Sequence, residues 1–207
     1  MTKKLLNTPW FYCALSFVHQ CLVILPGEFP KLFPDSGSYL SWYPHRTPLY
    51  PFLLSVFQTT ENTAIFQMLI FALSAGAFHL ICRMVIETLQ ETLQKKFPSA
   101  KAKEIFIWTG SLYFATNFEL LQFAPTILTE SLGISFFTFY FFSVLRWSSL
   151  RENAGGAASF LVKLYFVLSF LFFPIVLFML RPSFVLVPAA IYFFHVLKFL
   201  QQKKYTL

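Results

Sequence analysis

The chain consists largely of long apolar runs that alternate with short polar or proline-rich segments. Inside a lipid bilayer the backbone N–H and C=O groups find partners only within the protein, so apolar runs of about 20 residues form membrane-spanning helices. The pattern predicts six such helices. They lie at Trp10–Leu25, Thr63–Cys82, Ile105–Thr116 (with an extension toward Phe123), Ile127–Leu145, Phe160–Leu180 and Phe184–Phe199.

The composition leads to the same fold class. Of the 207 residues, 57% are hydrophobic and only 12% are charged, and Phe alone supplies 29. An ordinary soluble domain has about 25% charged residues, and a soluble chain of this size does not bury so much apolar surface. We therefore expect an all-α, polytopic helix bundle that forms one membrane domain over residues 1–207.

The basic residues predict the orientation of this bundle. The formal net charge is +7. With six helices, all but three of the 16 Lys and Arg residues fall in segments on the same side of the membrane as the N-terminus. The three exceptions are Lys31, Arg46 and Arg181. Because cytoplasmic loops carry the excess of basic residues, both termini are expected in the cytoplasm. Basic residues beside apolar runs contact lipid headgroups, so we expect membrane lipids as partners and no nucleic acid.

The segment 26–62 is predicted to be an extracytoplasmic loop with helices in the membrane interface. It contains half of the chain's 12 prolines, yet it also contains Tyr39, Trp42, Tyr43 and Tyr50. Trp and Tyr rings are favoured at the boundary between lipid and water, where short amphipathic helices also lie. Long structured loops are more often functional than idle.

Asp35 is the first candidate for chemistry in this loop. It stands in the sequence Pro34-Asp35-Ser36-Gly37, directly beyond the first apolar run. A carboxylate at this place can act as general base toward a hydroxyl or an amine. The same residues also favour a turn or a helix N-cap, and taken alone this structural interpretation is the better one.

Arg46 and its neighbour His45 are the second candidates. A guanidinium group is suited to a phosphate at the level of the lipid headgroups. Alternatively, Arg46 anchors the loop by extending toward lipid phosphates, and His45 is simply solvated.

The third candidates are Glu130 and Arg181, which follow different apolar runs on the same predicted side. A charge at membrane depth costs about 2.5–3.5 kcal/mol on insertion scales, so Glu130 is expected to face the bundle and meet Arg46, Arg181 or a polar substrate. A purely structural ion pair between Glu130 and Arg181 is an equally good interpretation. No spacing of Cys or His residues indicates a metal site.

Four short motifs follow one another along the chain. They are Asp35-x-x-x-Tyr39, Arg46-Thr47-Pro48-Leu49-Tyr50-Pro51, Pro125-x-x-x-Thr129-Glu130 and Arg181-Pro182. In this order and with this topology the chain resembles the GT-C class of integral-membrane glycosyltransferases, in particular the bacterial relatives of protein O-mannosyltransferases and of the lipid A aminoarabinose transferase. Members of the class are usually longer, with more helices.

The resemblance implies a bacterial inner-membrane enzyme that moves a sugar from a polyprenyl-phosphate donor to an extracytoplasmic glycan, lipid or protein acceptor. It implies that Asp35 is the general base and that Glu130 is a second acid orienting the acceptor or the arginines. Arg46 and Arg181 would hold the donor phosphate, and Tyr39, His45 and Tyr50 would line the site. No cofactor is implied, and a divalent cation is neither required nor excluded. The alternative is an inactive or partial relative that binds the lipid carrier or has a structural role.

Overall fold

The computed structural model describes residues 2–24, 27, 29–30, 37, 40–41, 48–93, 99–125, 129–153 and 160–194. Every regular element in these ranges is a helix, which confirms the all-α prediction. The long helices are α2 (Pro9–Ile24), α5 (Thr60–Leu93), α6 (Ala100–Thr116), α8 (Thr129–Asn153), α9 (Phe160–Val167) and α10 (Phe173–Leu180). The π-helix η1 (Leu168–Phe172) joins α9 to α10, and the 3-10 turn η2 (Pro182–Val185) leads into a helical stretch over residues 186–194. The short helices are α1 (Thr2–Leu6), α4 (Leu49–Phe57) and α7 (Phe118–Leu121).

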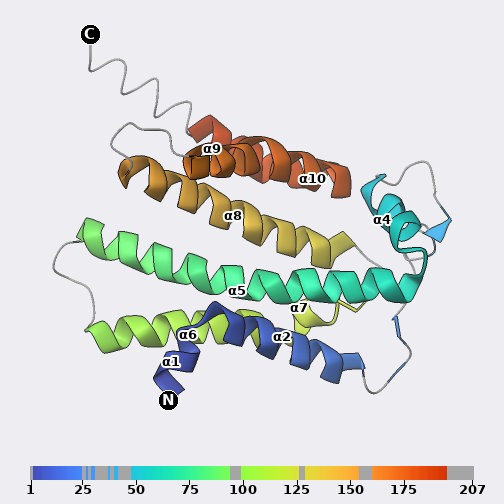
Figure 1. The fold of residues 1–207 in the computed structure, drawn as a ribbon, viewed down its shortest axis with the longest axis horizontal. Coiled ribbons are helices and arrows are strands. Elements are labelled where there is room, and N and C mark those ends of the chain that lie inside the picture. Colours follow the sequence, from blue (N-terminus) through green and yellow to red (C-terminus); the bar gives the residue numbers. More distant parts are fainter. Residues whose placement is uncertain are drawn as a thin grey trace, which may run out of the picture.

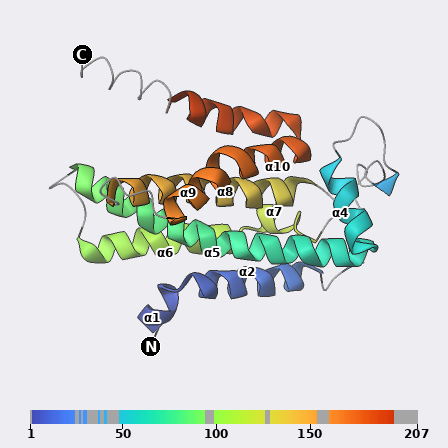
Figure 2. The same ribbon diagram turned by 45° about the horizontal axis from the view of Figure 1, so that its top comes forward.

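The long helices lie side by side along one axis, and α5 is at the centre (Figures 1 and 2). Helix α5 packs against α2, α6 and α8, and α10 packs against the other side of α8. We call the end with Ile24, Thr60 and Leu180 the α4 end, because α4 lies there. The opposite end, with Asn153 and Phe160, is the α9 end.

Each of the six predicted runs contains a helix. Among the described residues, two helices are long and apolar enough to cross a membrane, namely Thr60–Gln90 and Phe160–Leu180. The helices Pro9–Ile24 and Pro182–Phe194 are apolar but shorter. The figure of six crossings therefore stays a prediction.

The structure corrects several predicted boundaries. Residues 60–62, assigned to the loop 26–62, belong to α5, because the Thr59 hydroxyl accepts a hydrogen bond from the Asn62 N–H at 3.1 Å and caps the helix. Glu61 lies in the first turn, where its charge is favoured by the helix dipole. Three helices are also longer at their other ends: α5 continues to Leu93 instead of Cys82, α6 starts at Ala100 instead of Ile105, and α8 continues to Asn153 instead of Leu145.

The third apolar run bends where its polar residues begin. Helix α6 ends at Thr116, Asn117 has an extended backbone, and α7 starts one residue later. The Asn117 side chain accepts a hydrogen bond from the Leu120 N–H at 3.2 Å, which satisfies a donor at the start of α7. The predicted bend after Thr116 is therefore present.

The π-helix η1 follows from a proline inside a long apolar helix. Pro174 has no N–H, and its ring would clash with the carbonyl four residues earlier in a regular α-helix. The Phe173 N–H bonds to the Leu168 carbonyl instead, five residues back. Ser169, the second residue of η1, is fully buried, and its hydroxyl donates to the Tyr165 carbonyl at 2.7 Å and contacts Ser143 Oγ at 3.0 Å. The segment Phe160–Leu180 thus passes its proline without a break.

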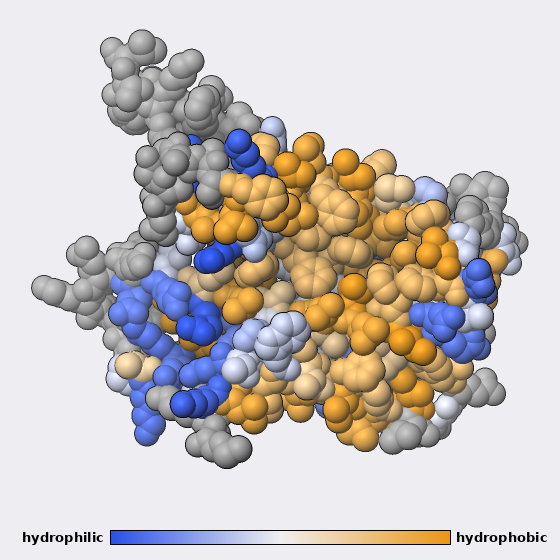
Figure 3. Space-filling model, in the orientation of Figure 1, coloured by the Kyte–Doolittle hydropathy of each residue, from blue (hydrophilic) through white to orange (hydrophobic). Residues whose placement is uncertain are grey.

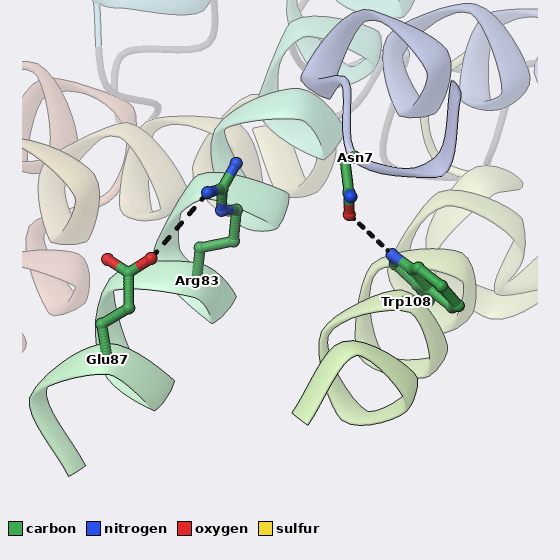
Figure 4. A network of polar contacts seen from close by, with 4 residues as sticks. All are labelled: Asn7, Arg83, Glu87 and Trp108. Atoms are coloured by element: carbon green, nitrogen blue, oxygen red, sulfur yellow. Dashed lines mark hydrogen bonds and ion pairs between the residues drawn. The ribbon is translucent and has the colours of Figure 1, made fainter. Parts of the chain in front are cut away.

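Helix α2 approaches α5 closely at Gly76. A Cβ atom at this position would overlap Cys13 Sγ and lie 3.1 Å from the Pro9 carbonyl oxygen. The Tyr12 ring stacks on the His79 ring at 4.5 Å in the same interface. At the start of α2, the Trp108 indole N–H donates to Asn7 Oδ1 at 3.0 Å and ties the N-terminal turn to α6 (Figure 4).

The distribution of polarity differs from that of a soluble bundle. Large apolar side chains are exposed along the long helices, for example Leu69, Phe172 and Phe178. Buried positions instead include many hydroxyl side chains, namely Ser16, Thr63, Ser74, Ser111, Thr129, Ser131, Ser135, Thr138, Ser143 and Ser169. Figure 3 shows this exterior as an apolar band between two hydrophilic ends.

Candidate functional site

The Glu130–Arg181 pair is the centre of the candidate site at the α4 end. Glu130 lies in the first turn of α8, where the helix dipole favours a carboxylate. Arg181 directly follows α10, with an extended backbone whose N–H still bonds to the Leu177 carbonyl. Arg181 Nη1 lies 3.5 Å from Glu130 Oε1, and 56% of the arginine side chain remains exposed against 36% of the glutamate. Two groups separated by 51 positions in the sequence thus meet as the sequence suggested.

A glycine on α8 allows this meeting. A Cβ atom at Gly133 would lie 2.5 Å from Phe184 Cε2, so the ring packs directly on the bare α8 backbone. The Arg181 guanidinium lies 6.0 Å from the centre of the same ring, within the range of a cation–π contact. Phe184 therefore holds the turn after α10 against the start of α8, which places Arg181 next to Glu130.

A buried chain of hydrogen bonds ends at Ser131, the residue that follows Glu130. The Tyr50 hydroxyl donates to Gln67 Oε1, and Gln67 Nε2 donates to Ser131 Oγ at 3.2 Å. This chain links α4 to α5 and α5 to α8, one residue away from Glu130. Tyr50 is fully buried in an apolar cluster with Leu132 and Leu180, so its ring fixes α4 on the bundle. The prediction that Tyr50 contacts a substrate stays a prediction.

The remaining predicted residues, Asp35, Tyr39, His45 and Arg46, lie outside the described residues. The helices that flank their segment, α2 and α4, both have the relevant terminus at the α4 end (Figure 1). Phe29, which precedes the segment, packs against the Tyr50 cluster. The described helix ends on either side of this segment, Ile24 and Leu49, therefore lie at the end of the bundle that carries Glu130 and Arg181.

Three residues of this site were not found from the sequence: Gln67, Ser131 and Phe184. For Gln67 a signal was present, because a single amide side chain inside an apolar helix is expected to face other helices. Ser131 and Phe184 gave no signal, because serines and phenylalanines are frequent throughout the chain.

No group of three or more His, Cys, Asp or Glu side chains that could hold a metal occurs within the described part of the chain. The site contains the half-exposed guanidinium of Arg181, the carboxylate of Glu130 beside it, and the apolar cluster that includes Leu132 and Leu180. Such a set can bind a phosphate through the arginine and hold a hydroxyl or amine through the carboxylate. Comparison of the chain with protein-family models, with curated proteins and with solved structures finds no match in any of the three.

Proposed function

We propose that this chain is a polytopic membrane glycosyltransferase that moves a sugar from a polyprenyl-phosphate donor to an acceptor at the α4 end. The observation that carries the proposal is the half-exposed Arg181, which lies beside Glu130 at the end of an apolar bundle. A polyprenyl phosphate has a matching division into an apolar and a charged part: its tail lies in the lipid, and its phosphate lies at the level of the headgroups.

The exterior supports insertion of the whole bundle into a membrane. Exposed apolar side chains surround the long helices, whereas most of the buried hydroxyls donate to a backbone carbonyl three or four residues earlier. Ser135, for example, donates to the Ser131 carbonyl at 2.8 Å, and Thr138 donates to the Ile134 carbonyl at 2.9 Å. In water this arrangement would leave a large apolar surface exposed, whereas in lipid it satisfies both the surface and the interior.

The lengths of the described helices up to Leu180 support most of the proposed crossings. The segment Phe160–Leu180 has 21 residues, or about 32 Å of helix, which matches a hydrocarbon core of about 30 Å. Helices α2 and α6 have 16 and 17 residues, or about 24–26 Å, a mismatch that local thinning of the bilayer accommodates. The basic residues Arg83, Lys101 and Arg146 lie toward the α9 end, so the positive-inside rule places that end in the cytoplasm.

In the proposed reaction Arg181, together with Arg46, stabilises the negative charge that develops on the leaving lipid phosphate. Asp35 takes the proton from the acceptor as the acceptor oxygen or nitrogen attacks the anomeric carbon and the bond to phosphate breaks. Glu130 holds the Arg181 guanidinium in place and orients the acceptor.

A transfer assay tests this proposal. The purified chain in vesicles is given radiolabelled polyprenyl-phosphate mannose or polyprenyl-phosphate aminoarabinose together with a membrane extract as the source of acceptors. We expect label to leave the donor fraction, Asp35→Asn to abolish this transfer, and Arg181→Lys to reduce it because the bidentate fork is lost. Glu61→Gln, which removes an exposed acid at the same end, is the matched control and should retain transfer. Full activity of Asp35→Asn would reject the assigned base.

The orientation is tested independently by cysteine labelling in intact cells. Reagents that do not cross the membrane should label Glu61→Cys at the α4 end and leave Lys101→Cys at the α9 end unlabelled until the cells are opened. Labelling of Lys101→Cys in intact cells would reverse the assigned orientation without affecting the bundle itself.

The second candidate is a protein that binds the lipid carrier without transferring sugar. It is favoured by the observation that Glu130 is already paired with Arg181 and that Tyr50 is fully buried. This function predicts retention of polyprenyl phosphate by the wild-type chain, its loss in Arg181→Gln, and no movement of label in the transfer assay.

A further inference from the structure

At the α9 end a cavity of about 370 Å³ opens between α5, α8 and α9. Its polar lining consists of Arg83 and Glu87 of α5, Arg146 of α8 and Tyr165 of α9. Two arginines from different helices therefore face one space that contains a single carboxylate among its lining residues. The cavity carries a net positive charge.

Neither arginine is strongly compensated. Arg83 Nη2 lies 3.8 Å from Glu87 Oε1, and their side chains are 45% and 63% exposed (Figure 4). An exposed pair one helical turn apart contributes little, about 0.3–0.5 kcal/mol, and is easily replaced by a better anion. Arg146 is exposed and forms no ion pair with any residue that the structure describes. The cavity thus offers two guanidinium groups to an incoming anion.

The apolar part of the lining lies on the side nearer the middle of the bundle. Leu80 and Phe142 each precede an arginine of the cavity by about one helical turn, on α5 and on α8. With a rise of 1.5 Å per residue, a separation of three or four residues is about 5–6 Å along the helix. Both helices run toward the α9 end, and the arginines lie beyond the midpoint of each helix. Leu80 and Phe142 therefore lie nearer the middle of the bundle than the arginines, and the lining changes from apolar to charged toward the α9 end.

We propose that this cavity binds the phosphate headgroup of an anionic phospholipid from the leaflet at the α9 end. The phosphate lies between Arg83 and Arg146, whose planar guanidinium groups can each donate two hydrogen bonds to it. The glycerol and the first carbons of the acyl chains lie against Leu80 and Phe142. Inorganic phosphate can bind the same two arginines, but it gains nothing from contact with the apolar residues Leu80 and Phe142. The apolar part of the lining therefore favours a lipid over inorganic phosphate.

The proposal depends on membrane insertion with the α9 end in the cytoplasm but not on sugar transfer. The cytoplasmic leaflet is where anionic lipids attract basic residues, each worth about 1 kcal/mol near the surface. A cavity between helices adds to this general attraction a fixed position for one headgroup. The bound lipid would join α5, α8 and α9 at the end where the basic side chains otherwise repel each other.

Retention of lipid by the purified chain is the test. The full chain in detergent is mixed with equal amounts of phosphatidylglycerol and phosphatidylcholine, and the lipids that remain bound are counted by native mass spectrometry. We expect the wild-type chain to prefer phosphatidylglycerol, and Arg83→Gln or Arg146→Gln to reduce this preference about fivefold each. Glu87→Gln should increase it, because a competing carboxylate is removed from the cavity.

Two matched variants control for overall charge. Arg151→Gln removes an arginine from the same helix α8, 5.5 Å from the Trp147 ring and outside the cavity lining, and Lys101→Gln removes an exposed lysine from α6. Both should keep the preference for phosphatidylglycerol. Circular dichroism and gel filtration establish that each variant is folded, so that a loss of lipid is not a loss of structure.

Three results overturn the proposal: equal retention of both lipids by the wild-type chain, an unchanged preference in folded Arg83→Gln/Arg146→Gln, or an equal effect of Arg151→Gln. Millimolar inorganic phosphate should leave the lipid bound. If it displaces phosphatidylglycerol and binds equally well by itself, the assignment to a lipid is wrong and the cavity binds a soluble anion. A chain that retains phosphatidylglycerol through these arginines but transfers no sugar refutes the enzyme proposal and leaves this one intact.

Discussion

The close contact between Gly133 and Phe184 gives the most stringent test of the α4 end. A Cβ atom at position 133 would lie 2.5 Å from Phe184 Cε2 and 3.0 Å from Cζ, so Gly133→Ala forces the ring to move. The ring has little room, because the Phe137 ring lies 5.3 Å away on one side and the Arg181 guanidinium lies 6.0 Å away on another. A displaced Phe184 therefore displaces Arg181 from Glu130.

The magnitude follows from two opposing terms. Alanine is more favourable than glycine inside a helix by about 1 kcal/mol, which stabilises the variant. Overpacking of a fitted contact costs about 1–3 kcal/mol. Gly110→Ala is the matched control, because a Cβ atom there would lie 3.5 Å from Cys82 Sγ, an ordinary contact. The helix term is common to both variants, so the difference between them isolates an overpacking cost of about 1–3 kcal/mol.

Unfolding by sodium dodecyl sulfate in mixed micelles, followed by circular dichroism, measures the free energies. Gly133→Ala should be less stable than Gly110→Ala, and Gly133→Ala/Phe184→Leu should recover much of the loss because a smaller side chain accepts the new methyl group. If the two alanine variants agree within about 0.5 kcal/mol, the usual error of such comparisons, Phe184 does not pack on Gly133 and the explanation for the position of Arg181 is wrong.

Three further substitutions test separate contacts. Tyr50→Phe leaves the Gln67 carbonyl oxygen without its phenol donor and should cost about 0.5–2 kcal/mol in the same unfolding assay. Glu130→Gln breaks an exposed pair and should cost less than about 1 kcal/mol, while binding of polyprenyl phosphate to Arg181 increases because the competing carboxylate is gone. Trp108→Phe removes the indole donor that holds the N-terminal turn and should accelerate amide hydrogen exchange in α1.

Each of these has a matched control and a result that contradicts it. Tyr113→Phe removes a phenol that is 68% exposed and should be neutral, and a loss equal to that of Tyr50→Phe would mean that the buried bond is unimportant. Glu61→Gln should leave phosphate binding unchanged, and an increase there as large as in Glu130→Gln would indicate a general charge effect. Trp10→Phe, at a 71% exposed tryptophan, should not change exchange in α1, whereas unchanged exchange in Trp108→Phe would show that its bond does not hold the turn.

The sequence alone determined where the helices lie. The apolar runs that were predicted to end near Asn117 and at Arg181-Pro182 became helices that end there, whereas the start of α5 lies three residues before the predicted Thr63. The reason is local, because backbone hydrogen bonds in a helix join residues four apart, and caps and prolines act on their own turn. Even the approach of Arg181 to Glu130 was suggested by the cost of an unpaired charge next to lipid.

The tertiary structure alone decided which faces of the helices meet. Apolar residues occur on all sides of the long helices that the structure describes, so no single stripe shows which side is buried. Gly133 receives a phenylalanine from the turn after α10, Gln67 bonds to Ser131 from a distance of 64 positions, and Arg83 shares a cavity with Arg146. Each of these depends on the rotation of one helix against another, which is set by the packing of side chains distant in sequence and is not encoded in the spacing of residues along either helix.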